Sequence, residues 1–199
     1  YISKFDIEII KGDIRDKKAI SNALKDVDGV VHLAASGSVV DSVSDPESNF
    51  DNNVVGTFCL FNECRKAGIK NIVFSSTGGA LIGNAKPPVN ESSLPLPISP
   101  YGSSKLCCEA YCSSFSYSYD MNIKALRFAN IIGKNSAHKK GAVTVFINSL
   151  VNKKPITIYG DGSATRDFLY VDDLCQGILN AFEKNIYGYN CIHLASGKE

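Results

Sequence analysis

Short apolar runs alternate with longer amphipathic stretches along nearly the whole chain. The apolar runs have the length of β-strands and lie at residues 6–10, 29–35, 71–74, 123–128, 156–159 and 190–195. The amphipathic stretches repeat apolar side chains with helical spacing at residues 16–24, 53–67, 101–118, 143–151 and 171–182. Strands that alternate with helices form βαβ units, whose strands are parallel. The pattern therefore predicts an α/β fold with a doubly wound parallel sheet.

Small and polar residues follow three of the predicted strands. Asp13 follows the first, Ala-Ala-Ser-Gly at 34–37 follows the second, and Ser-Ser-Thr at 75–77 follows the third. Each run alone is more typical of a tight turn. Ligands of parallel sheets bind at the carboxyl ends of the strands, and small residues let a bulky ligand approach the backbone. The runs together predict one cleft. The connections at residues 36–49 and 85–100 are expected to be loops.

The composition limits the partners. The chain has 199 residues, 44% of them hydrophobic, and a net charge of +1, which fits one soluble domain with a sizeable core. A charge this close to zero provides no basic field for nucleic acid. No apolar run approaches the roughly 18 residues of a membrane span, and no leader pattern opens the chain. We therefore expect neither nucleic acid nor membrane as a partner.

The seven cysteines are odd in number and contain no Cys-x-x-Cys pair. Free, mostly buried thiols in a reducing compartment fit this usage better than disulfides or a metal site. The sequence therefore predicts a cytoplasmic protein without a metal centre.

Tyr101 and Lys105 lie four residues apart, at the start of a helix introduced by Ser99 and Pro100. This spacing places both side chains on one helical face. Lowering the pKa of a phenol from about 10 to about 7 takes about 4 kcal/mol. One positive charge about 5 Å away supplies about 3 kcal/mol at an effective dielectric constant near 20. The pair is thus a candidate base, although Tyr-x-x-x-Lys alone is more often an ordinary surface pair.

Six motifs occur in the order and at the spacing of a known family. They are GDIRD at 12–16, HLAA at 32–35, NNVVGT at 52–57, FSST at 74–77, YGSSK at 101–105, and GDG followed by TRDFLYVDD within 160–173. With them the chain resembles the extended short-chain dehydrogenases/reductases, and within these the nucleotide-sugar epimerases of the UDP-glucose 4-epimerase type. The resemblance covers the whole chain. It implies a Rossmann-like fold, NAD as cofactor and a nucleotide sugar, a UDP-hexose, as substrate.

The resemblance also implies roles for individual residues. The implied NAD contacts are Asp13 and Ile14 beside the adenine, Leu33, Ala34, Ala35, Ser36 and Gly37 along the pyrophosphate and ribose, and Asn53, Ser75, Tyr101, Lys105, Phe128 and Ala129.

The implied catalytic group consists of Tyr101 as base, Lys105 as its cationic partner, and Thr77 as the hydroxyl residue, with Ser76 as the alternative one residue earlier. Substrate contacts are implied for Thr77 and Tyr101, and for the two residues named next.

Asn130 and Arg166 match positions that contact the diphosphate of the substrate. A guanidinium suits this role because its planar fork pairs with two phosphate oxygens at once. The rival interpretation of Arg166 is a salt bridge to Asp167 or Asp172.

The implied reaction inverts C4 of the sugar through a transient 4-keto intermediate, with hydride leaving to NAD⁺ and returning to the opposite face. The related 4,6-dehydratases carry Asp-Glu directly after the catalytic threonine, whereas Gly78 and Gly79 follow Thr77 here. An NAD(P)-dependent ketosugar reductase or a dehydratase of the same family remains an alternative. A non-catalytic scaffold relative is the alternative from another class.

The chain departs from the family pattern in three places. No Gly-x-x-Gly-x-x-Gly occurs, Ile82 replaces a usual tyrosine, and the closing C-terminal portion is not seen. We therefore expect a sheet that lacks its N-terminal strands and the end of the substrate-binding part, and weak or no NAD binding by these 199 residues alone. The expected division is a partial NAD-binding domain at 1–135 and a partial substrate-binding region at 136–199, interleaved with it. The family also implies a homodimer through the helices of Tyr101 and Asn53.

Overall fold

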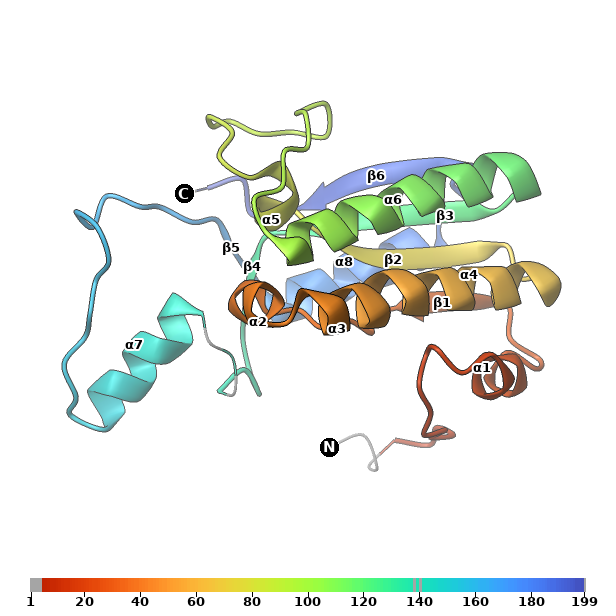
Figure 1. Ribbon diagram of the computed structural model, residues 1–199, viewed down its shortest axis with the longest axis horizontal. Coiled ribbons are helices and arrows are strands. Elements are labelled where there is room, and N and C mark those ends of the chain that lie inside the picture. The colour runs from red at the N-terminus through yellow and green to blue at the C-terminus, as the bar shows by residue number, and fades with distance from the viewer. Residues whose placement is uncertain (1–4, 138, 140, 199) are drawn as a thin grey trace.

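The computed structural model describes residues 5–137, 139 and 141–198 (Figure 1). Its helices and strands are, in chain order, α1 (Lys17–Ala23), β1 (Gly29–His32), α2 (Val39–Ser44), α3 (Pro46–Phe50), the π-helical turn η2 (Asp51–Val55), α4 (Gly56–Lys66), β2 (Asn71–Thr77), α5 (Gly79–Ile82), α6 (Pro100–Tyr119), β3 (Asn122–Phe128), β4 (Asn130–Ile132), α7 (Ala142–Val151), β5 (Phe168–Tyr170), α8 (Val171–Glu183) and β6 (Tyr189–Leu194).

Four parallel strands form the central sheet, in the order β1-β2-β3-β6. The helices α4 and α6 cover one face of this sheet, and α8 covers the other (Figure 1). Each connection between neighbouring strands crosses over through a helix, because parallel strands cannot be joined by a tight turn. The predicted α/β fold with a doubly wound parallel sheet is confirmed. A separate two-stranded sheet pairs β4 with β5.

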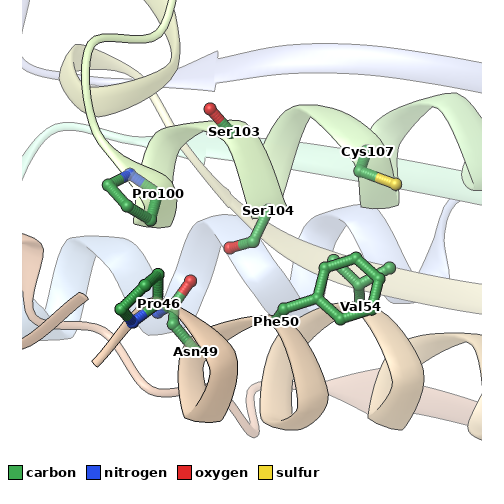
Figure 2. Close-up of a pocket in the computed structure, with 8 residues that line it drawn as sticks. All are labelled: Pro46, Asn49, Phe50, Val54, Pro100, Ser103, Ser104 and Cys107. Carbon is green, nitrogen blue, oxygen red and sulfur yellow. The ribbon is translucent and has the colours of Figure 1, made fainter. Parts of the chain in front are cut away.

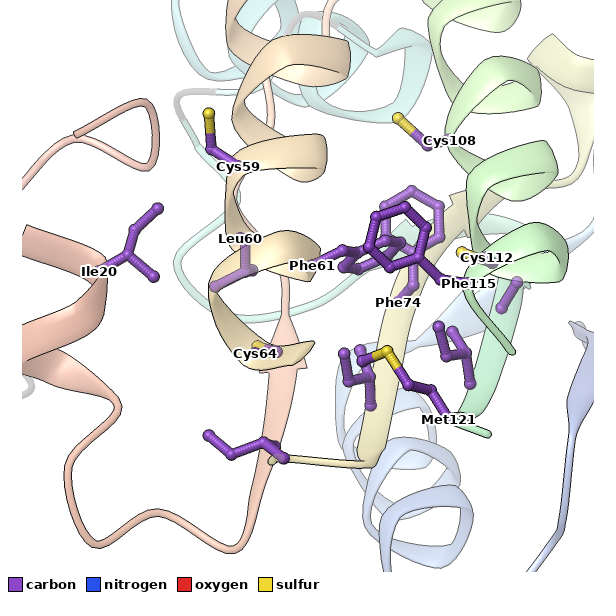
Figure 3. Close-up of a cluster of buried hydrophobic side chains, with 14 of the residues drawn as sticks. Ile20, Cys59, Leu60, Phe61, Cys64, Phe74, Cys108, Cys112, Phe115 and Met121 are labelled. Carbon is purple, nitrogen blue, oxygen red and sulfur yellow. The ribbon is translucent and has the colours of Figure 1, made fainter. Parts of the chain in front are cut away.

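Two apolar clusters hold the helices against the central sheet. The larger one lies under α4 and α6, where the rings of Phe74 and Phe115 sit 6.1 and 5.9 Å from that of Phe61 (Figure 3). The smaller one lies under α8 and consists of Val73, Leu126, Leu174, Ile178 and Ala181. Both faces of β2 and β3 are therefore buried, as the continuous apolar runs in these strands predict.

The helix α6 has a well-defined start. The hydroxyl of Ser99 accepts a hydrogen bond from the backbone N–H of Gly102 at 3.2 Å, and Pro100 occupies the first helical position. Gly102 is required because a Cβ there would lie 2.1 Å from the carbonyl oxygen of Ala80. The predicted helix at 101–118 is confirmed, and its first two turns carry Tyr101 and Lys105.

The predicted loop at residues 36–49 is wrong, because this segment contains α2 and α3. Ser38 caps α2 by accepting from the N–H of Asp41, and Asp45 caps α3 by accepting from the N–H of Ser48. Pro46 opens α3 at its first position, where a proline loses no hydrogen bond.

The predicted strands at residues 6–10 and 156–159 are also wrong. A strand needs a partner for its backbone hydrogen bonds, and no described strand pairs with either segment. Their apolar side chains lie at the surface instead, with Ile7 53% and Ile158 62% exposed. The three-residue strands β4 and β5 were missed because they are too short to show a period.

Three observations concern membrane spans, metal ligands and the state of the cysteines. No helix in the part of the chain that the structure describes has the length and apolar character needed to cross a membrane. The described residues also include no cluster of His, Cys, Asp and Glu suited to a metal ion. All seven cysteines are free thiols, and four of them are buried.

Candidate functional site

The predicted catalytic residues meet at the carboxyl edge of the central sheet. Thr77 is the last residue of β2, and Phe128, its register partner, is the last residue of β3. Tyr101 and Lys105 reach this edge from the first turns of α6. The structure thus brings together residues that lie far apart in the sequence.

Lys105 is almost fully buried behind this edge. Its side-chain ammonium donates a hydrogen bond to the carbonyl oxygen of Ser75 at 2.7 Å and lies 4.8 Å from the centre of the Phe74 ring. Burial, which disfavours the charged form, lowers the pKa of Lys105 from 10.5 to about 8. An ammonium has three N–H donors, so two remain for the paired hydroxyls of a ribose. This donor set fits the nicotinamide ribose that the family implies.

The side chains of Tyr101 and Thr77 interact at this edge. Burial raises the pKa of Tyr101, and the hydroxyl of Thr77 partly opposes this rise because it favours the phenolate. In the protein without NAD, desolvation therefore outweighs the other influences on Tyr101, and the net shift of its pKa is upward. A lowering of this pKa by Lys105 together with a cationic nicotinamide ring stays a prediction.

Ser76, the alternative catalytic hydroxyl, points away from Tyr101. Its hydroxyl donates to the buried carboxylate of Glu109, under α6. Successive side chains of a strand point to opposite faces, so Thr77 and Ser76 cannot both face the same ligand. The geometry favours Thr77 as the hydroxyl residue of the site.

Residues 33–37 follow β1 as an open, small-residue segment. Leu33, Ala34, Ala35 and Gly37 are exposed, and a Cβ on Gly37 would meet no atom within 4 Å. A ligand as bulky as a pyrophosphate with its ribose therefore has access to this backbone. The segment fits the cofactor contacts implied for it.

Asn53 holds this segment in place. Its amide oxygen accepts from the N–H of Ser36 at 2.8 Å, and its amide nitrogen donates to the carbonyl of Ser36 and to the hydroxyl of Ser104. Only 1% of Asn53 is exposed. The structure therefore places Asn53 as a support beneath the predicted cofactor segment. Asn49 gives Ser36 a second donor, which sequence analysis missed because a lone asparagine in a polar stretch carries no signal.

Asp13 and Ile14 lie beside the start of α4. The carboxylate of Asp13 accepts two hydrogen bonds from the guanidinium of Arg15 through separate nitrogens, which lowers the pKa of Asp13 to about 2. Ile14 packs so close to Gly56 that a Cβ on Gly56 would lie 2.5 Å from the Ile14 side chain. Asp13 remains half exposed and so stays accessible to a ligand.

Asn130 and Arg166 lie together at the small β4–β5 sheet. The amide of Asn130 donates to the carbonyl of Asp167, the residue next to Arg166. The guanidinium of Arg166 is exposed and donates to the carbonyl of Thr165. Among the described residues Arg166 forms no ion pair, so the rival salt bridge to Asp167 or Asp172 is not present. Ala129 links the two sheets by donating its N–H to Leu194 at 3.0 Å.

Two hollows lie near these residues. One of 290 Å³ has a polar lining that includes Ser36 and Gly37, next to the predicted cofactor segment. Another of 380 Å³ lies between α3 and α6 and is lined by Phe50, Val54 and Cys107 among others (Figure 2). None of the predicted catalytic residues lines the second hollow, so it lies apart from the chemistry.

A parallel sheet with a threonine at a strand end, and with a tyrosine and a lysine one helical turn apart, is the architecture that the resemblance to the short-chain dehydrogenases/reductases implies. Comparisons with known proteins agree with this class. A sequence model described as the NAD dependent epimerase/dehydratase family matches residues 2–191. The chain belongs to this family, which uses NAD as its cofactor.

Individual relatives give the same result. A protein of Methanocaldococcus jannaschii named a putative UDP-glucose 4-epimerase is 36% identical over 197 residues, which cover 96% of this chain and 63% of that protein. The crystal structure of UDP-glucose 4-epimerase from Thermotoga maritima with UDP-glucose shares 34% identity and a TM-score of 0.88, covering 94% of this chain and 62% of that one.

A dehydratase is also similar. The dTDP-glucose 4,6-dehydratase DesIV from Streptomyces venezuelae, with NAD and TYD bound, shares 28% identity and a TM-score of 0.86, covering 92% of this chain and 57% of that one. The chain thus spans about six-tenths of the length of these relatives. The resemblance drawn from the six motifs is confirmed at the level of the family.

Proposed function

We propose that the protein is an NAD-dependent epimerase that inverts C4 of a UDP-hexose. The observation that carries this proposal is the pairing of Thr77 with Tyr101 at the edge of the sheet, with the buried ammonium of Lys105 behind them. NAD, when bound, supplies the hydride acceptor and donor, and its oxidised form adds a positive charge beside the phenol.

The residues of this chain handle the proton and the orientation. Tyr101 takes the proton of the sugar 4-hydroxyl as hydride leaves C4, and it returns the proton after hydride is added to the other face. Thr77 orients both the phenol and the sugar oxygen. Lys105 stabilises the phenolate, and Arg166 holds the diphosphate while the sugar turns. No atom is lost from the substrate, so the product is its C4 epimer.

The residues after Thr77 separate this reaction from dehydration. Eliminating water needs an acid and a base beside the keto sugar, and Gly78 and Gly79 provide neither. Gly78 is also held tightly, since its N–H donates to the carbonyl of Phe128 and an added Cβ would lie 3.3 Å from that oxygen. This observation favours epimerisation over the dehydratase reaction of DesIV.

We further infer a homodimer through the outer faces of α4 and α6. Phe58 on α4 is 38% exposed and stacks its ring edge-on with Tyr111 of α6 at 5.4 Å. Phe50, 53% exposed, continues the same apolar strip toward the 380 Å³ hollow. The unpaired thiols support a cytoplasmic location. A Phe58→Asp variant is expected to sediment as a monomer, with Leu179→Asp on α8, which covers the opposite face of the sheet, as its control.

The test uses the protein expressed from its complete reading frame. It is incubated with UDP-glucose and, separately, with UDP-N-acetylglucosamine, and the products are followed by NMR. We expect the galacto epimer to appear without net consumption of NAD, and to be lost in Tyr101→Phe. Thr77→Val is expected to lose most of the rate as well.

Other outcomes would replace the proposal. Consumption of one reduced cofactor per sugar identifies a ketosugar reductase, and loss of water from the product identifies a dehydratase. Failure to bind NAD at all identifies a scaffold relative.

A further inference from the structure

The face of the central sheet under α6 changes character at its last row. Side chains that are register partners on β2, β3 and β6 form rows across the sheet. The row through Phe74 and Ala125 is apolar. The next row consists of Ser76, Arg127 and His193, and it lies directly beneath the edge formed by Thr77 and Phe128.

Glu109 of α6 covers this polar row. One carboxylate oxygen accepts from the hydroxyl of Ser76 at 2.5 Å and from Nε of Arg127 at 3.0 Å. The other accepts from Nη2 of Arg127 at 2.8 Å. Glu109 is 4% and Arg127 5% exposed, so the bidentate ion pair is shielded from water. The nearby carboxylate raises the pKa of Arg127, so the guanidinium keeps its charge.

We propose that Ser76, Glu109 and Arg127 form a positioning unit that fixes α6 on β2 so that Tyr101 meets Thr77. The proposal rests on the function proposed above. Glu109 follows Tyr101 by eight residues on the same helix, which is about 12 Å along its axis. Ser76 directly precedes Thr77. The unit therefore joins the two elements that carry the catalytic pair.

The choice of an ion pair at this row has a physical reason. Apolar contacts are not directional, so a helix held by them alone tolerates small shifts along the sheet. Charge-assisted, bidentate hydrogen bonds have fixed distances and angles. A displacement of about 1 Å is enough to separate two hydroxyl groups that share a hydrogen bond. The row nearest to the catalytic edge is the one where such a displacement matters most.

The first test replaces the whole ion pair. In the full-length protein the double variant Glu109→Leu/Arg127→Met exchanges a buried ion pair for apolar side chains, a change that often preserves stability. Tyrosine labelled with ¹³C at Cζ reports the titration of Tyr101, and its signal is identified by its loss in Tyr101→Phe. We expect the pKa of Tyr101 to rise, because the influence of Thr77 that lowers it is weakened when α6 shifts.

A double-variant comparison separates positioning from general damage. Thr77→Val alone is expected to raise the pKa of Tyr101, and to raise it no further when added to the double variant. The matched control is Glu63→Leu/Lys66→Met, which removes the ion pair of α4 and leaves the titration of Tyr101 unchanged. In turnover the double variant is expected to lose about ten- to a hundredfold in kcat with KM within about twofold.

Ser76→Ala serves if the double variant does not fold, since it removes only one hydroxyl. It is expected to raise the pKa of Tyr101 in the same direction. A titration equal to that of the wild type in whichever variant folds overturns the proposal. Wild-type protein without epimerase activity, combined with the expected titrations, rejects the proposed function and leaves the positioning unit intact.

Discussion

The two halves of α6 bury different chemistry under the same sheet. The first half carries Tyr101, Lys105 and Glu109, and the last two are at most 4% exposed. The second half carries Cys112, which is fully buried, and Phe115, which packs on the ring of Phe61. One helix thus contributes ionisable groups at one end and apolar groups at the other.

The difference shows where stability and function are located. Burying an ammonium costs free energy, since the charge loses its hydration. Burying aromatic and aliphatic groups stabilises the fold by about 25 cal/mol for each Å² of apolar surface. The apolar contacts of the second half of α6 therefore offset the cost of burying the charged groups of its first half. They keep these groups in place at the edge of the sheet. The predictions below change one side of this comparison at a time.

The largest effect is expected where Phe61 of α4 packs against the apolar half of α6. Phe61→Ala removes the ring that contacts Phe74 and Phe115 and leaves a cavity, so the free energy of unfolding falls by about 4 kcal/mol. Denaturation with urea measures this change. Tyr117→Ala, at a position that is 92% exposed, is the control and is expected to stay within about 0.5 kcal/mol. Equal losses of unfolding free energy in the two variants would contradict the conclusion that the Phe61 ring stabilises the fold through its buried contacts.

Removing the charge from the first half has the opposite sign. The lowering of the Lys105 pKa from 10.5 to about 8 corresponds to about 3 kcal/mol of destabilisation. Lys105→Met recovers this energy and loses one hydrogen bond, so we expect a gain of about 2 kcal/mol near pH 7.

The pH dependence of this gain gives a second check. Below about pH 8 the folded and unfolded chains both carry the proton, and the full penalty applies. Above 10.5 both are neutral, so the advantage of Lys105→Met disappears between these values. The exposed substitution Lys154→Met is the control. A pH-independent gain would argue against burial as its cause.

His32 tests a buried polar group that packs against the apolar cluster. It bonds to the Thr57 hydroxyl at 2.9 Å, its ring lies 5.6 Å from that of Phe74, and burial lowers its pKa from 6.5 to about 3. Between these two pKa values the imidazole of His32 therefore binds a proton in the unfolded chain but stays neutral in the folded chain. We expect about 1.5 kcal/mol of stability to be lost on acidification from about pH 7.5 to about pH 5.5. Urea denaturation at both pH values measures this loss, and an unchanged loss in His32→Gln would exclude His32 as its source.

The smallest effect is expected at the cap of α6. Ser99→Ala removes the acceptor for the N–H of Gly102 and lowers the free energy of unfolding by about 1 kcal/mol. Ser99→Asp keeps an acceptor and is expected to restore most of this loss. Differential scanning calorimetry of the three proteins measures the effect, and a loss of similar size in Ser99→Asp would rule out the cap.

The sequence predicted the parts of the fold that bury a periodic face. The apolar runs that became β2 and β3, and the helical spacing in α4 and α6, are long enough to be recognised. The caps at Ser38 and Asp45 were readable signals for α2 and α3, but helices of six and five residues show no period. The isoleucines at positions 9 and 10 looked like a strand because composition does not reveal whether a pairing partner exists.

The site was predicted through motifs and not through pairing. Tyr101 and Lys105 were found by their spacing and Thr77 by the resemblance of a short motif, whereas the Glu109–Arg127 ion pair joins residues 18 positions apart on different elements. A single sequence contains no information about which distant charges meet. The extent to which Tyr101 is desolvated could not be predicted for the same reason, since burial is a property of the packed protein.

Two asparagine side chains fix the backbone of Ser36 in the folded protein, before any ligand binds to the predicted cofactor segment. Asn53 accepts from the backbone N–H of Ser36, and both Asn49 and Asn53 donate to its backbone carbonyl. The neighbouring residues Ala35 and Gly37 are exposed to solvent. The conformational entropy of this segment is thus lost during folding and not during binding. A dinucleotide that binds there as proposed meets a segment that is already ordered. Its association is therefore expected to follow a single exponential phase in stopped-flow fluorescence, without a slower rearrangement afterwards.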